Sequence, residues 1–196
     1  MDSAVPDDSK ENGAIWWEDA ALREAAFGDS AEARRAAEAG WKLYPLDTQT
    51  QSLWLPAIQA QLELNRHNPA GALAALQRAL PPIEYGAITF LANLSPLYTA
   101  YIRGEAYLAA GQDAAAAAEF QKILDHAGLV WNCWTGALAR LGIARANALE
   151  AKNAKGADAA RVRALTAYKD FLALWKDADP QIPIYRQAKT EYAKLR

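Results

Sequence analysis

The stretch from residue 96 to residue 128 limits the possible folds most, because it has the pattern of a helical hairpin. Two helical patterns flank a short polar break, Gly111-Gln112-Asp113, that suits a turn. Small and large side chains stand three or four apart on the two halves: Gly104 and Tyr107, then Ala116 and Phe120. Residues at these spacings share one helix face, so the small residue lets two helices approach and the aromatic ring fills the space beside it.

The same pattern recurs along the chain. Polar breaks stand at Gly28-Asp29-Ser30 and at His67-Asn68-Pro69, and a further turn is expected between Asn153 and Gly156. The other small and large positions are Ala21 and Ala33, then Ala60, Ala72 and Leu76, then Ala167 and Phe171. We predict an all-α fold of about four helical hairpins, near residues 14–47, 53–82, 97–130 and 137–179. Residues 83–95 are expected to form an irregular connection, and residues 152–162 an insertion that lengthens the last pair.

The second hairpin carries the clearest local signals. Asn68 suits a helix cap and Pro69 the first helical position, where the missing N–H of proline is not needed. Pro56 predicts that the preceding helix begins or kinks there. Glu63 occupies the position of a large residue, and Leu64 is expected to fill that space instead.

A single amphipathic helix is predicted over residues 182–195, opened by Pro183. Its apolar face consists of Ile184, Ala188, Tyr192 and Leu195. The last hairpin of an array exposes an apolar face, so a terminal helix of this kind is expected to cap it.

Composition excludes several function classes. The chain has 196 residues, of which 52% are hydrophobic, and its formal net charge is -2, so no basic excess favours nucleic-acid binding. It contains no run of about 18 apolar residues, and no membrane insertion is expected from this segment. Residues 1–13 are polar and acidic, which predicts a disordered lead-in rather than a secretory signal. No pattern in the chain indicates a compartment.

The small and large positions resemble those of tetratricopeptide repeat (TPR) units. The resemblance implies a right-handed superhelical array with a capping helix. Residues 44–66, 101–126 and 171–195 further resemble the C-terminal TPR region of bacterial serine/threonine protein kinases of the eukaryotic-like type. That second resemblance covers nearly all of residues 14–196 and implies a sensor or docking region that follows a kinase domain in a signalling protein. Two features depart from it: the inserted residues 152–162, and Asn147 where an aromatic residue is usual.

The sequence predicts no enzyme. It lacks a Gly-rich phosphate loop, an HRD-type catalytic loop and a DFG motif. His67 falls in a predicted turn and His126 at a predicted helix end, while Cys133 between Trp131 and Trp134 suits a small buried hydrophobe. No metal-ligand spacing is present, and no cofactor is expected.

The first helices of TPR hairpins line a concave groove, and that groove is the predicted binding site. Projection of the repeat positions places eight residues on it: Trp54, Gln61, Asn65, Tyr98, Tyr101, Glu105, Leu108 and Arg145. Leu141 falls on the same face. Aromatic groups with a few polar ones suit a peptide or a partner protein. The competing interpretation is that several of them, Trp54 and Leu141 especially, pack between the units.

Two further hypotheses stay open. The alternative function is that of a small-molecule sensing module, with a pocket formed by Trp131 and Trp134. Self-association into a homo-oligomer, through the terminal helix or the first unit, is also compatible with the sequence, because an uncovered apolar end can stack on a second copy.

Overall fold

The computed structural model describes residues 20–22, 25, 30–43, 45–79, 84–85, 97–153 and 157–196. The predicted lead-in, the break at Gly28-Asp29, nearly all of the 83–95 connection and residues 154–156 lie outside these ranges. Every regular element within them is a helix, which confirms the all-α prediction. The elements are α2 (Ser30–Leu43), the π-helix η2 (Thr50–Trp54), α3 (Leu55–Asn65), α4 (Pro69–Leu76), α6 (Tyr98–Ala109), α7 (Asp113–Asp125), α8 (Ala127–Val130), α9 (Trp134–Asn153), α10 (Ala157–Leu174) and α11 (Pro183–Leu195).

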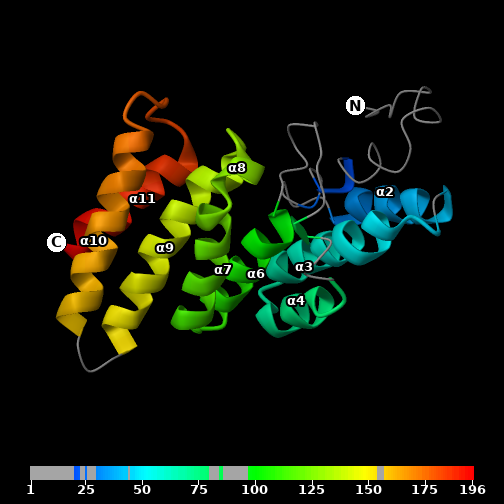
Figure 1. Ribbon diagram of the computed structural model, residues 1–196, viewed down its shortest axis with the longest axis horizontal. Helices are drawn as coiled ribbons and strands as arrows, with labels where there is room; N and C mark the ends of the chain where they lie inside the picture. The colour runs from blue at the N-terminus through cyan, green and yellow to red at the C-terminus, as the bar shows by residue number, and fades with distance from the viewer. Residues whose placement is uncertain are drawn as a thin grey trace.

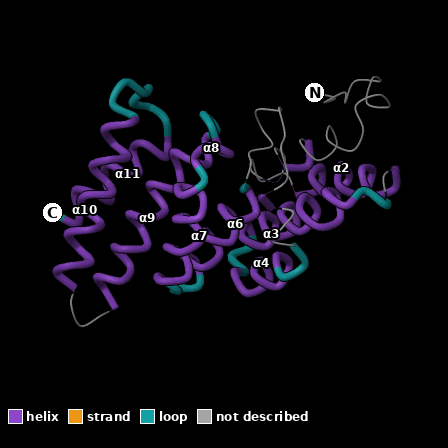
Figure 2. Tube along the Cα trace, in the orientation of Figure 1, coloured by secondary structure: helices purple, strands orange, loops and turns teal. Residues whose placement is uncertain are grey.

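Three hairpins follow one another along the long axis of the molecule (Figure 1). They are α3 with α4, α6 with α7, and α9 with α10. Helix α9 begins at Trp134, three residues before the predicted unit 137–179. Both helices of one hairpin contact the first helix of the next, since α3 and α4 contact α6 while α6 and α7 contact α9. Helix α2 packs on α3 at one end, and α11 packs on α10 at the other. Figure 2 shows the short loops that join α3 to α4 and α6 to α7.

The central hairpin turns as its glycine predicts. Gly111 has φ +74°, a left-handed conformation that side chains other than glycine rarely adopt. Close helix contact depends on Phe120, which is fully buried. A Cβ atom on Gly104 would lie 2.7 Å from the Phe120 ring, and one on Gly142 of α9 would lie 2.6 Å from it. Phe120 therefore sets the approach of both α6 and α9 to α7.

The second hairpin shows how Pro56 is accommodated. The helical run does not break, but passes through the π-helix η2 immediately before α3, with Pro56 in the first turn of α3. A wider turn at this point fits a residue that cannot donate a backbone hydrogen bond. Asn68 caps α4 as predicted, since its Oδ1 accepts from Gly71 N at 3.0 Å. Leu64 packs against the core of this hairpin, whereas the Glu63 carboxylate bonds to Arg66 and Asn68.

The last pair is longer than the others, as the insertion predicts. Helix α9 has 20 residues and α10 has 18. Phe171 is fully buried there, but Ala167 is only partly buried, and the buried alanines of α10 are Ala160 and Ala164. Helix α11 begins at Pro183 and buries Tyr185 and Ala188. The residues that precede Trp131 form the short helix α8.

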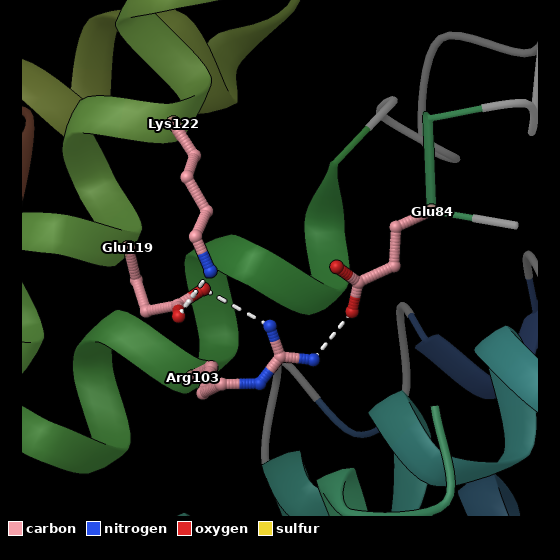
Figure 3. Close-up of polar contacts among 4 residues, drawn as sticks. All are labelled: Glu84, Arg103, Glu119 and Lys122. Carbon is pink, nitrogen blue, oxygen red and sulfur yellow. Dashed lines mark hydrogen bonds and ion pairs between the residues drawn. The ribbon is translucent and has the colours of Figure 1, made fainter. Parts of the chain in front are cut away.

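A buried ion cluster ties the segment before α6 to the central hairpin (Figure 3). The Arg103 guanidinium on α6 pairs with Glu84 and, at 3.0 Å, with Glu119 on α7. Lys122 Nζ pairs with Glu119 at 2.5 Å. Burial alone would lower the pKa of Arg103, but hydrogen bonds and attraction from the two carboxylates outweigh it and raise that pKa. Glu84 and Glu119 are therefore each paired with a cation, because an unpaired charge is costly in buried, low-dielectric surroundings.

None of the described helices combines the length and hydropathy needed to cross a lipid bilayer.

Candidate functional site

Six of the eight predicted groove residues lie in one polar row across α3, α6 and α9. The row begins at Asn65, whose Nδ2 donates to the Ala25 carbonyl oxygen at 2.6 Å. Gln61 Nε2 donates to Asn65 Oδ1 at 2.9 Å, and the Tyr98 hydroxyl donates to Gln61 Oε1 at 3.2 Å. The Tyr98–Gln61 bond joins α3 and α6, the first helices of two successive hairpins.

Aromatic rings form the middle of the row. The Tyr98 and Tyr101 rings are 6.3 Å apart, and Trp134 of α9 meets both edge-on, at 5.5 Å and 5.2 Å. Tyr98 is 5% exposed and Trp54 is 3% exposed. These two rings, and the fully packed Leu141, agree with the interpretation that they hold the units together.

Three helices meet in the last part of the row, which is ionic. Tyr101 is hydrogen-bonded to the Glu105 carboxylate, and Glu105 lies close enough to Arg145 of α9 to attract it. Arg145 in turn donates to both carboxylate oxygens of Glu191 on α11, at 3.0 Å and 3.1 Å. The Tyr168 hydroxyl donates to Glu191 at 3.0 Å. The terminal helix thus supplies the Glu191 carboxylate to this end of the row.

Burial is the largest single influence on the pKa values of Glu105, Tyr101 and Arg145. It raises the pKa of Glu105, and repulsion from Glu191 adds to that rise, while Arg145 and the Tyr101 hydroxyl oppose it. Burial also raises the pKa of Tyr101, as does the neighbouring Glu105 charge. Burial would lower the pKa of Arg145, but bonding to Glu191 and attraction from both carboxylates raise it. Two carboxylates share one guanidinium here, so repulsion between them acts in the same direction as burial on the pKa of Glu105.

An open cleft of about 420 Å³ adjoins the ionic end. Its walls come from α6, α9, α10 and α11 and include two predicted groove residues, Leu108 and Arg145. Apolar groups line it at Ala148, Leu149 and Leu195. Lys152 and Lys194 stand at its rim, both exposed and without an ion pair in the described ranges.

Trp131 and Trp134 lie at different sites, although the sequence places them in one pocket. Trp134 belongs to the aromatic cluster with Tyr98 and Tyr101, whereas Trp131 lines a separate pocket of about 430 Å³. The latter pocket also contains Cys133 and Trp175. Trp131 is 70% exposed and has φ +51°, so a strained backbone holds this ring at the pocket rim.

The two histidines occupy helix ends. His67 lies in the turn before α4 with φ +58°, and His126 follows α7, where its Nδ1 lies 2.8 Å from the Lys122 carbonyl oxygen. Within the described residues no group of three or more His, Cys, Asp or Glu side chains could hold a metal ion.

Sequence reasoning missed Glu191 and Tyr168, which complete the ionic end. The sequence indicated that Tyr192 of the terminal helix faces the last hairpin. It gave no sign that the neighbouring charged residue, Glu191, also faces it. The contacts of Glu191 join positions 23 and 46 residues apart, and helical spacing carries no signal over such separations. Comparison of the chain with protein-family models, with curated proteins and with solved structures found no match.

Proposed function

We propose that the protein is a non-catalytic scaffold of the TPR type that binds a segment of a partner protein. The successive stacking of three hairpins supports this proposal, since the first helices α3, α6 and α9 lie next to one another as they do in TPR arrays. In this proposal the array is a right-handed superhelix and α11 is its capping helix. If a kinase domain accompanies it in a longer protein, the array is the docking region of that kinase.

The observation that carries the proposal is the cleft between α6, α9 and α11. Leucine and alanine side chains line it, and two exposed lysines without ion pairs in the described ranges stand at its rim. Apolar walls with a few charged groups at the edge suit a peptide that combines an apolar residue with acidic ones. The polar side chains on α3 and α6 are hydrogen-bonded to one another, and we therefore assign the partner to the cleft rather than to that row.

Site-specific photocross-linking tests this assignment. A benzoylphenylalanine residue replaces Leu149 in the cleft, and a control variant carries it at Lys169, an exposed position on α10 outside the cleft. We expect one partner peptide to cross-link at position 149 and not at position 169. A synthetic copy of that peptide should bind the wild-type chain and lose affinity about tenfold in K152E or K194E. Cross-links of equal yield at both positions, or none at position 149, would contradict the proposal.

A second candidate function is small-molecule sensing at the Trp131 pocket. The exposed indole of Trp131, the ring of Trp175 and the side chain of Leu174 give this pocket an apolar lining of a size that suits small ligands. Because Cys133 lines the same pocket, an occupant should slow its alkylation. A metabolite panel scored by thermal shift and by the rate of Cys133 alkylation tests this function. If every compound in the panel fails to raise the melting temperature and to protect Cys133, the result counts against it.

A further inference from the structure

A second polar cleft lies on a different face of α3, away from the groove residues. Its volume is about 430 Å³, and it is bounded by α2, η2, α3 and the turn after α4. The apolar part of its lining comes from Ala37, Leu55, Ile58 and Leu62. Neither Gln61 nor Asn65 contributes, so this cleft is separate from the polar row.

The charged groups of the cleft leave one positive charge unbalanced. Three arginines and two glutamates line it: Arg34, Arg66, Arg78, Glu38 and Glu63. The Glu63 carboxylate is already engaged, since it accepts from Arg66 at 2.9 Å and from Asn68 at 2.8 Å. Arg34 and Arg78 make no ion pair or hydrogen bond within the part of the chain that the structure describes. Arg34, Arg78 and Glu38 are all exposed to solvent, and Glu38 also lacks an ion pair among the described residues. Two guanidinium groups and one carboxylate therefore stand at the cleft without a partner ion.

The cleft also contains a buried hydrogen-bond donor without a partner among the described residues. This donor is Nε2 of Gln51. An unpaired buried amide is costly, and such a group is normally satisfied by protein, water or ligand. Trp41, which is 53% exposed, supplies an aromatic ring beside these donors.

We propose that this cleft binds a small monocarboxylate with a planar aromatic body. One negative charge balances the lining, carboxylate oxygens accept from guanidinium and amide donors, and the ring packs on Trp41 and the apolar lining. The net single positive charge favours a monoanion over a phosphate dianion. This site goes beyond the scaffold proposed above and does not depend on it.

The test titrates the full chain with 2-naphthoate and with its uncharged analogue 2-naphthamide, followed by calorimetry and ligand-observed NMR. We expect 2-naphthoate to bind with a Kd below roughly 1 mM and the amide to bind about tenfold more weakly. R34Q and R78Q should each weaken 2-naphthoate binding roughly three- to tenfold. Q51E, which replaces a donor by an acceptor, should weaken it at least as much.

Matched controls separate this site from general effects. Arg35 is the neighbour of Arg34 on α2, is exposed and paired with Glu32, and does not line the cleft, so R35Q should leave binding unchanged. K152E, which alters the α6–α9–α11 cleft, should also leave it unchanged. Equal affinity for the carboxylate and the amide, an equal loss in R35Q and R34Q, or no binding of 2-naphthoate would overturn the proposal. The last result would mean that water satisfies Gln51.

Discussion

Arg145 on α9 and Glu191 on α11 form a bidentate ion pair, with both guanidinium-to-carboxylate distances near 3 Å. Their side chains are 19% and 26% exposed, so the pair is shielded but not sealed from water. It joins the terminal helix to the first helix of the last hairpin.

Loss of the charge on Glu191 should therefore loosen α11. We expect E191Q to lower the free energy of unfolding by about 1–3 kcal/mol in urea titrations, because Arg145 and the Tyr168 hydroxyl both lose their anionic acceptor. The control is E150Q. Glu150 and its partner Arg163 are 40% and 51% exposed, and an exposed pair contributes about 0–1 kcal/mol. Equal losses in the two variants would show that the Arg145 pair has no special role.

The raised pKa of Glu105 predicts how stability depends on pH. The folded chain holds this proton more tightly than the unfolded chain, so Glu105 contributes stability that is fully present below its ordinary pKa of 4.5 and is lost as pH rises through the higher folded value. The stability of the wild type relative to E105Q should therefore fall as pH rises above about 4.5. Urea unfolding of both proteins at each pH measures the difference, because the other titrating groups are common to both. A difference that stays constant or rises with pH contradicts the raised pKa.

The contact of Gly104 with Phe120 predicts a steric cost. G104A would place a methyl group 2.7 Å from a ring that is fully buried, and we expect a loss of about 1–3 kcal/mol in the free energy of unfolding. G128A is the control, since a Cβ at Gly128 in α8 meets nothing within 4 Å, and alanine there should be neutral or stabilising by up to about 1 kcal/mol. In an F120L background the G104A change should cost little. If it costs as much as in the wild type, the clash lies elsewhere.

Removal of Arg103 should be the most damaging charge change among the ion pairs of the described residues. R103Q leaves Glu84, whose side chain is 2% exposed, and Glu119 without the cation that they share, and we expect a loss of about 3–5 kcal/mol. Thermal and urea unfolding measure it. In a triple variant that also carries E84Q and E119Q, most of the loss should disappear, because no buried carboxylate then lacks a partner. Persistent loss in the triple variant would point to lost packing of the arginine stem instead.

The repeat pattern predicted the helices well because it depends on neighbours three or four residues apart. Gly104, Ala116, Phe120, the Asn68 cap and the turn at Gly111 all follow from local chemistry and are found as expected. The groove was harder to predict. Burial of Trp54 and Tyr98 depends on how neighbouring units pack, and the Arg145–Glu191 pair joins two helices that only the folded chain brings together. The split of Trp131 from Trp134 depends on the left-handed conformation at Trp131, which a non-glycine residue does not signal.

Phe120 packs against two glycines that lie 38 positions apart in the sequence, Gly104 on one side and Gly142 on the other. Enlarging either glycine requires a smaller side chain at position 120, and a smaller side chain there opens a void against the remaining glycine. Side-chain size at these three positions can therefore change only if they change together. In homologous chains that keep this packing, substitutions at 104, 120 and 142 should be correlated, because a change at one of them alters the space open to the other two.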